Sequence, residues 1–418
     1  MKILLVVTAD GFKHHPVIPL GIMYIADSLQ KNQHNYDIID LNFHGDTDTA
    51  LIQKIENCRP DVIGISIRNI AETSEMNDIY ERVYDMVSLA QKYAKVVLGG
   101  AGFSIFPKTI MRITGADYGI IGSGEEAMIQ IIKNLESIAL GSVISGGDNF
   151  IDSDISSVFK NYWTMYEKYF IISDTAIPIQ TIRGCELSCR YCSYPSLTNH
   201  KVQKRSISLM MKEIQSIIEF TNRRLFYFVD AVFNMDLNHT KSVLKAITDC
   251  RLDINFGCCI NPKNYDEEMI CMMQKAGCTY CEVGVDSFSD SRLKDLNKGF
   301  DKKQTRDLIS QLEKKNIPYS FSLVLGGLGE TEETLSETIR IAAGYSEAPI
   351  NAFIGERIYP RTPLAKILNI DSEEQLHKAT KESVYINESL IEQLKLLVRD
   401  LKPPKWNFTG ELFLGENL

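Results

Sequence analysis

The stretch GCELSCRYC at residues 184–192 places three cysteines, Cys185, Cys189 and Cys192, in one short and otherwise polar segment. It directly follows residues 179–183, which are predicted to form a β-strand. Three thiolates in such a loop can each bind one iron of a cubane cluster, and the fourth iron then keeps open coordination positions. A structural zinc ion would need four protein ligands and no open coordination position. The spacing therefore favours a [4Fe–4S] cluster over zinc.

The sequence on both sides of this loop predicts a series of parallel strand–helix units. Strands are expected at 179–183, 225–229, 255–260, 280–285, 319–325 and 351–359, with helical patterns between them. Six such units are fewer than the eight of a complete barrel, so a partial, open (β/α)6 barrel of the TIM type is predicted over 176–365. The remainder, 366–418, is expected to be a mostly helical C-terminal segment.

The N-terminal part predicts a second α/β domain over 1–140. Short apolar strands are expected at 2–8, 36–41, 62–67, 96–99 and 118–121, separated by helical patterns. That alternation predicts a doubly wound, Rossmann-like parallel sheet whose strands present their following loops at one edge. Two of those loops are rich in glycine, which allows a ligand to approach the backbone closely. Residues 141–175 are expected to be a linker.

Composition and charge exclude several classes of protein. The chain has 418 residues, which suggests two or three domains, with a net charge of -9 and a pI of about 5.4. That balance carries no electrostatic signature of nucleic-acid binding. The apolar run at the N-terminus stops at Asp10 and is too short for a signal peptide, and no later run could span a bilayer. We expect a cytoplasmic protein with no nucleic-acid or membrane partner.

The second half of the chain, which contains the cysteine loop, resembles the radical S-adenosylmethionine (SAM) superfamily. Tyr191 supplies the aromatic residue that is typical before the third cysteine. The segments YFVDAVF (227–233), CEVGVDS (281–287), LVLGGLGET (323–331) and IYPRTP (358–363) are similar to its successive strand motifs. The resemblance implies that SAM binds the open iron of the cluster. It also implies SAM contacts at Tyr191, Asp230, Asp286, Ser287, Gly326 and Glu330.

The first half resembles the cobalamin-binding subfamily of these enzymes, which includes the class B methyltransferases. The matching segments are PLGIMYIA (19–26), VVLGG (96–100) and DYGIIGSGE (117–125). The resemblance implies cobalamin contacts at Pro19, Leu20, Gly21, Ser66, Arg68, Gly99, Gly100, Gly122, Gly124 and Glu125. The D-x-H-x-x-G box of many cobalamin proteins is absent, since Asp10 and His14 are four residues apart. No histidine ligand to cobalt is therefore predicted, and Arg68 is a candidate neighbour of an open cobalt face.

Both cofactors together imply a cobalamin-dependent radical SAM C-methyltransferase. Its substrate would be an unactivated carbon, or less often a phosphorus, of a small-molecule or peptide natural-product precursor, and its reductant a flavodoxin or ferredoxin. The alternative is ring formation or rearrangement without methyl transfer. Methylthio transfer to tRNA would need three further N-terminal cysteines, where only Cys58 is available. A non-enzymatic cofactor-binding protein is disfavoured because all three cluster cysteines are kept.

Of the six further cysteines in the second half, four lie close together in the sequence, at 258, 259, 278 and 281. Residues three apart on a strand point to opposite faces, so Cys278 and Cys281 are predicted not to converge. We interpret these four residues mostly as small buried side chains. Cys258 or Cys259 could instead face the barrel lumen. His14 and His15 are expected to be surface loop residues.

Overall fold

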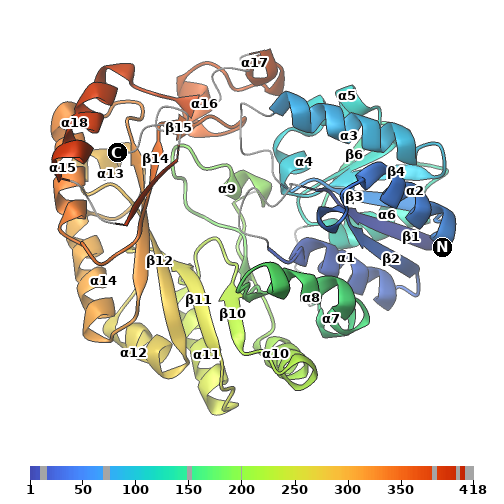
Figure 1. Cartoon of the computed structure of the whole chain (residues 1–418), viewed down its shortest axis with the longest axis horizontal. Helices are drawn as coiled ribbons and strands as arrows, with labels where there is room; N and C mark the ends of the chain where they lie inside the picture. The colour runs from blue at the N-terminus through green and yellow to red at the C-terminus, as the bar shows by residue number, and fades with distance from the viewer. Residues whose placement is uncertain are drawn as a thin grey trace. The chain divides into compact units, whose positions relative to one another are not determined.

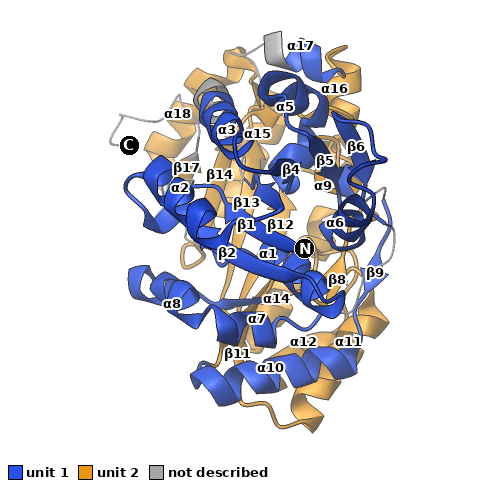
Figure 2. Ribbon diagram, turned by 90° about the vertical axis from the view of Figure 1, so that its right-hand side faces the viewer, with its two compact units in different colours: residues 1–178, 196–223, 372–381 blue, residues 179–195, 224–371, 382–418 orange. Residues whose placement is uncertain are grey.

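The computed structural model describes residues 1–9, 17–68, 76–147, 153–198, 200–378, 384–401 and 405–409. Two compact units make up the chain (Figure 2). Unit 1 contains residues 1–178, 196–223 and 372–381, and unit 2 contains residues 179–195, 224–371 and 382–418. Within the described ranges, no helix combines the length and apolar character that crossing a membrane requires.

Unit 1 is built on a six-stranded parallel sheet in the order β2-β1-β3-β4-β5-β6. Its strands are β1 (Lys2–Val7), β2 (Asn35–Asp40), β3 (Val62–Ser66), β4 (Lys95–Gly99), β5 (Tyr118–Ile121) and β6 (Ser142–Ser145). The first five confirm the predicted strands. The sixth lies in the expected linker. Only Val143 and Ile144 of its four residues are apolar, too short a pattern to indicate a strand.

Helices cover both faces of this sheet, as expected of a doubly wound domain (Figure 1). α1 packs against α6, and α3 packs against α2 and α5. The helices of unit 1 are α1 (Leu20–Lys31), α2 (Thr47–Cys58), α3 (Met76–Ala90), α4 (Ala101–Ile105), α5 (Pro107–Thr114), α6 (Gly124–Lys133), α7 (Ser156–Asn161), α8 (Trp163–Ile172), α10 (Ile207–Thr221) and α17 (Glu373–Lys378), with the 3₁₀ turn η1 (Leu41–Phe43) and the short strand β9 (Gln203–Lys204).

Unit 2 is built on a seven-stranded sheet in the order β17-β14-β13-β12-β11-β10-β7. Its strands are β7 (Ile177–Ile179), β10 (Leu225–Phe228), β11 (Asn255–Ile260), β12 (Cys278–Asp286), β13 (Tyr319–Leu325), β14 (Ile350–Ile354) and β17 (Trp406–Thr409). β10 to β14 pair in parallel, as the open barrel predicts. β17 comes from the C-terminal tail, joins β14 in parallel and extends this sheet by one strand.

The larger helices of unit 2 lie on one face of that sheet and leave the other face to loops (Figure 1). Side-chain caps start several of them: Asp301 caps α14 with Gln304 in a capping box, and Thr331 caps α15. The remaining elements are α9 (Tyr194–Leu197), α11 (Leu237–Asp249), α12 (Glu267–Lys275), α13 (Asp290–Asp295), α14 (Lys302–Lys314), α15 (Glu332–Ala343), α16 (Pro363–Ile367), η2 (Glu388–Leu390), α18 (Ile391–Leu401), β8 (Ile182–Arg183), β15 (Glu356–Arg357) and β16 (Val384–Tyr385).

Candidate functional site

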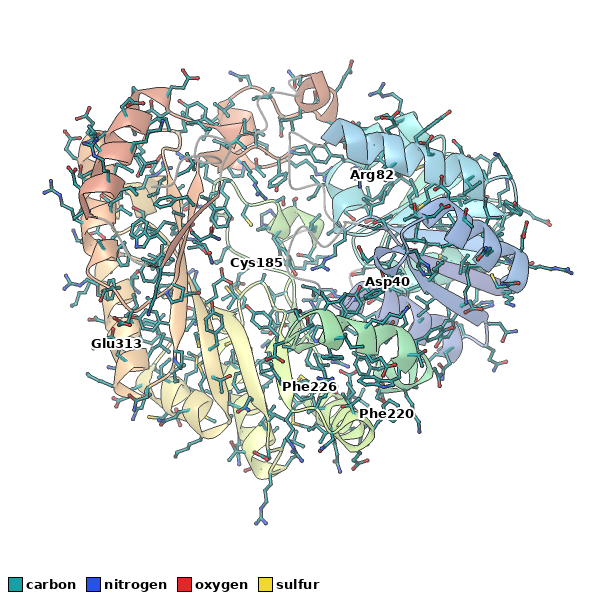
Figure 3. All side chains as sticks on the ribbon, viewed as in Figure 1. Asp40, Arg82, Cys185, Phe220, Phe226 and Glu313 are labelled. Carbon is teal, nitrogen blue, oxygen red and sulfur yellow. The ribbon has the colours of Figure 1, made fainter. Side chains whose placement is uncertain are left out.

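The three-cysteine loop begins at Gly184, immediately after β8, where a φ of +97° turns the chain away from the strand. Figure 3 shows Cys185 on the opposite side of the unit 2 sheet from Glu313 of α14. Cys185 and Cys189 are buried and Cys192 is half-buried. The loop therefore lies over the sheet face that the larger helices leave uncovered.

The separation of the three sulfur atoms suits a cluster better than a single metal ion. One zinc ion with Zn–S bonds of about 2.3 Å would hold its thiolates about 3.8 Å apart. Among the described residues, the Sγ atoms of Cys185, Cys189 and Cys192 do not form a group with all separations within 4.8 Å. Thiolates bound to three different irons of a cubane lie farther apart than thiolates on one ion. The described residues therefore do not form a preformed single-ion site here, and three thiols on one loop remain the donor set that a [4Fe–4S] cluster takes.

A buried lysine supplies positive charge beside these thiols. Burial raises the pKa of all three, that of Cys192 to about 12, while Lys298 acts in the opposite direction on each. Burial would also lower the pKa of Lys298, but the negative charges of the Asp286 carboxylate and of a Cys189 thiolate outweigh it and raise that pKa. The Lys298 Nζ lies 2.6 Å from Asp286 Oδ2. Lys298 therefore stays protonated and favours the thiolate form that iron requires.

Asp286 connects the cysteine loop to the end of β12. The Tyr191 hydroxyl donates to Asp286 Oδ2 at 2.5 Å, on the same oxygen that Lys298 contacts. Asp286 has a φ of +66°, a region that Asp tolerates better than most longer side chains. Tyr191 and Asp286 were both expected to contact SAM, and the structure brings them together, with Asp286 buried and Tyr191 half-buried. Lys298 was not foreseen, because a lone lysine after α13 matches no motif.

A second buried charge network holds the residue between Cys189 and Tyr191. Arg190 donates to both carboxylate oxygens of Glu356, at 3.1 and 2.5 Å, and its Nη1 lies 2.7 Å from Asp295 Oδ2. Arg292 donates to the same Glu356 at 2.5 Å, and both arginines donate to the Leu328 carbonyl. The network fixes the cysteine loop to α13, to β15 and to the loop after β13. Sequence reasoning missed it because its members are up to 166 residues apart.

Asp230 supports the approach to the cysteine loop. Its Oδ1 accepts from the backbone N–H groups of Thr181 and Ile182 at 2.8 and 3.0 Å, and its Oδ2 accepts from the Thr181 hydroxyl. His239 Nε2 lies 3.2 Å from the Thr181 carbonyl. Asp230 therefore anchors the backbone three to four residues before Cys185. Its predicted contact with SAM stays a prediction.

Three other predicted SAM contacts lie at buried turns. The Ser287 hydroxyl is 2.7 Å from that of Thr338 and accepts from the backbone of Ser289. Gly326, with a φ of +72°, directly follows β13 and donates its N–H to Glu330 Oε2. Burial raises the pKa of Glu330 to about 7, although Arg292 and two backbone N–H groups partly oppose that shift. Ser287 and the carboxylate of Glu330 are thus engaged with the protein itself.

Polar side chains line the open face of the sheet between these turns. Along β12, Cys281, Val283 and Val285 are buried, whereas Tyr280 and Glu282 on the other face are half-buried. The Ser322 hydroxyl donates to Glu282 at 2.9 Å, and the hydroxyls of Tyr280 and Ser320 are hydrogen-bonded. This face therefore carries one carboxylate and several hydroxyl groups.

The remaining cysteines correct one prediction. Cys278 and Cys281 do converge, with their sulfur atoms 3.5 Å apart, and Cys258 lies with them. The reason is a register shift: Phe256 pairs with Cys278 but Gly257 pairs with Tyr280, so Thr279 is an extra residue in β12. The bulge turns Cys278 onto the face of Cys281.

The alternation of side chains along β11 decides which of the adjacent residues Cys258 and Cys259 faces the open side of the sheet. Cys258 is fully buried with Phe256 and Ile260, while Cys259 is half-buried on the face of Glu282. Hydrogen bonds from Cys258 and Cys281 lower the pKa of Cys278. Burial raises the pKa of Cys259 to about 12, and the nearby Glu282 carboxylate adds to that shift.

In unit 1, the residues expected to contact cobalamin gather at the carboxyl ends of the parallel strands. Ser66 ends β3, Gly99 ends β4, and Gly122 directly follows β5. Gly100 has a φ of +96°, and a Cβ there would lie 2.4 Å from the Ile67 carbonyl oxygen. Gly122 has a φ of +79° and donates its N–H to the Ser104 hydroxyl at 3.0 Å. These turns require glycine and expose backbone at the ligand-binding edge of such a sheet, which fits cobalamin.

The other expected cobalamin contacts lie around two helix starts. Pro19 precedes α1, which Leu20 and Gly21 begin, and nothing lies within 4 Å of a Cβ built on Gly21. Gly124 begins α6 against Ile25, and Glu125 is buried there. Arg68 is exposed and donates to the Val17 carbonyl at 3.1 Å. Asp10, His14 and His15 lie outside the described residues.

In a comparison with known proteins, each half of the chain matches a family model. Residues 179–342 match the Radical SAM superfamily model, and residues 4–132 match the B12 binding domain model. An uncharacterized methyltransferase of Pyrococcus horikoshii is 24% identical over 365 residues, covering 82% of this chain and 78% of that protein. The tryptophan 2-C-methyltransferase of Streptomyces laurentii is 22% identical over 436 residues, covering 85% and 72%.

A solved structure has the same fold. The radical SAM methyltransferase TsrM of Kitasatospora setae, with cobalamin and a [4Fe–4S] cluster bound, aligns with a TM-score of 0.73 at 20% identity, covering 87% of this chain and 76% of that one. The chain therefore carries a radical SAM domain and a B12 binding domain, and it is a radical SAM enzyme that uses a [4Fe–4S] cluster, SAM and cobalamin.

Proposed function

We propose that this enzyme transfers a methyl group from SAM to a carbon, or less often a phosphorus, that lacks a nucleophilic lone pair, in a small-molecule or peptide precursor. The observation that supports this proposal is the presence of the three-cysteine loop and the B12 binding domain on one chain. When bound, the three cofactors together supply radical hydrogen abstraction and a methyl donor for carbon that ordinary displacement cannot methylate. The names of the two relatives above, both methyltransferases, point the same way.

The residues of unit 2 hold the cluster loop in one conformation. Cys185, Cys189 and Cys192 would supply three ligands to the cluster and would leave one iron open to SAM. Arg190 fixes the loop through Glu356, so that the loop position does not depend on the cofactor. Lys298 keeps positive charge beside the thiolates. Asp230 orders the backbone that leads into the loop.

The open face of the unit 2 sheet is proposed to bind the substrate. Tyr280, Glu282, Ser320 and Ser322 present hydroxyl groups and one carboxylate there. Hydroxyls both donate and accept hydrogen bonds, whereas the ionised carboxylate only accepts. Glu282 therefore favours a substrate that carries an amine or another hydrogen-bond donor.

Unit 1 is proposed to bind cobalamin at the carboxyl edge of its sheet. The loops at Gly99–Gly100 and Gly122–Gly124 would contact the nucleotide tail, and Arg68 would lie near the cobalt face. Reducing equivalents would come from a flavodoxin or ferredoxin.

The test is an anaerobic reaction with methyl-labelled SAM, a chemical or flavodoxin reductant and candidate substrates, followed by mass spectrometry. Methyl transfer predicts one S-adenosylhomocysteine and one 5′-deoxyadenosine per product, and a product that gains the labelled methyl group. A product without added carbon would overturn the methyltransferase proposal in favour of ring formation or rearrangement. The cluster assignment would survive that result, because both reactions require cleavage of SAM.

A further inference from the structure

A second group of cysteines lies inside the unit 2 sheet, apart from the cluster loop. Cys258 comes from β11, and Cys278 and Cys281 come from β12. Their relative exposures are 0%, 7% and 0%, and their sulfur atoms all lie within 4.8 Å of one another. Cys258 and Cys281 are direct register partners, and the bulge at Thr279 brings Cys278 to the same face. We call these three residues the sheet triad.

The separations within the sheet triad suit one metal ion. Two thiolates at about 2.3 Å from a tetrahedral ion are about 3.8 Å apart. The Cys278 and Cys281 sulfur atoms are 3.5 Å apart, and the third sulfur lies within the same small radius. The triad therefore needs only small side-chain adjustments to place three thiolates on a common ion.

The chemistry of the triad selects a thiophilic ion. Thiolates prefer soft or borderline cations, and hard ions such as Mg²⁺ prefer oxygen ligands. Within the described part of the chain, no fourth His, Cys, Asp or Glu belongs to the group. Three thiolates around a divalent ion leave one buried negative charge, whereas a monovalent ion would leave two. Since buried charge is costly, a divalent ion is favoured.

We propose that Cys258, Cys278 and Cys281 bind one divalent thiophilic ion of the Zn²⁺ class, at a site separate from the [4Fe–4S] cluster. The three cysteines supply three of the four ligands that such an ion takes, and a neutral donor would complete the coordination. The ion crosslinks β11 to β12 within the sheet whose opposite face carries Glu282 and Cys259. It takes no part in the proposed methyl transfer, so the site stands or falls independently of that function.

The test uses the full-length chain with the cluster ligands removed, the Cys185→Ala/Cys189→Ala/Cys192→Ala variant, titrated anaerobically with Cd²⁺ as a spectroscopic substitute for Zn²⁺. We expect one equivalent to bind, with thiolate-to-cadmium absorbance and a higher melting temperature. Adding Cys281→Ala should remove both effects, whereas adding Cys271→Ser, on α12 outside the triad, should leave both unchanged. Titration with Zn²⁺ and with Cu(I) in parallel identifies the preferred ion.

A second measurement tests the proposal without any substitution in the triad, so it does not require a triad variant to fold. The cluster-free variant, with and without Zn²⁺, is treated with a thiol-alkylating reagent and mapped by mass spectrometry. We expect Zn²⁺ to slow alkylation of Cys258, Cys278 and Cys281 at least tenfold relative to Cys250, which is exposed. Equal rates with and without Zn²⁺, or Cd²⁺ binding that survives Cys281→Ala, would overturn the proposal. Tighter binding of Cu(I) than of Zn²⁺ would overturn the choice of a divalent ion.

Discussion

The cluster loop and the sheet triad are both sets of three cysteines in unit 2, but they are assembled in different ways. The loop gathers its thiols within eight residues, 185–192, and needs no other strand to do so. The triad draws on two strands and on a bulge at Thr279. Among the described residues, the triad thiols lie within 4.8 Å of one another and the loop thiols do not. A sequence motif can reveal the first arrangement, and only strand register reveals the second.

The largest expected difference between the two sets is in cluster binding. Cys192→Ala should abolish both the [4Fe–4S] cluster and the cleavage of SAM to 5′-deoxyadenosine, because the third iron loses its ligand. The matched change in the triad, Cys258→Ala, should leave iron content and SAM cleavage near the level of the unmodified protein. Iron and sulfide analysis and chromatography of 5′-deoxyadenosine after anaerobic reconstitution measure both. Equal loss of iron in the two variants would contradict the separation of the two sets.

The support of the cluster loop gives the next largest effect. Arg190→Met leaves Glu356 and Arg292 buried with incomplete pairing, and breaking a buried ion pair in this way typically costs about 3–5 kcal/mol. The matched control is Arg224→Met, since Arg224 forms an exposed pair with Asp253 at 3.7 Å. An exposed pair contributes about 0–1 kcal/mol. Denaturant unfolding of the two apoproteins compares them, and equal midpoints would show that the Arg190 network does not stabilise the loop.

The same contrast explains which features of the structure could be predicted from the sequence alone. Each short motif of the cysteine loop and of the parallel strands is local, so the loop, both sheets and most strands were predictable. Lys298, Arg292 and Glu356 were not, because a buried ion pair depends on residues that only the fold brings together. Cys278 was misplaced because the alternation rule assumes a regular strand, and the extra Thr279 breaks that rule. The two short strands β6 and β17 carry too few apolar residues to form a pattern.

Glu330 gives a smaller, pH-dependent effect at the turn that carries the Arg190 network. Its folded-state pKa of about 7 lies above its ordinary value of 4.5, so the folded protein binds the proton more tightly than the unfolded chain does. The resulting stabilisation is complete below pH 4.5 and is lost as the pH rises through 7, by about 3 kcal/mol in total. Glu330→Gln should remove this dependence.

The measurement is the unfolding free energy of the two apoproteins between pH 5 and pH 8. The unmodified protein should lose stability relative to Glu330→Gln across that range. The control is Glu333→Gln at the exposed start of α15. Hydrogen bonding to Thr331 lowers the pKa of Glu333, so this carboxyl stabilises the folded protein when it is ionised, whereas Glu330 does so when it is protonated. Parallel profiles for the unmodified and Glu330→Gln proteins would rule out a raised pKa at Glu330.

The smallest effect reverses the order of the two cysteine sets. In metal-free apoprotein, Cys281→Ala removes a fully buried thiol and leaves a small cavity, which should cost about 1–2 kcal/mol. Cys192→Ala removes a half-buried loop thiol and should change stability by only about 0.5 kcal/mol. The position that matters most for the cluster therefore matters less for folding. Denaturant midpoints measured with a chelator present test this reversal, with Cys250→Ala as the exposed control. If Cys192→Ala proved the more destabilising change, the loop thiols would contribute to the folded core without any iron.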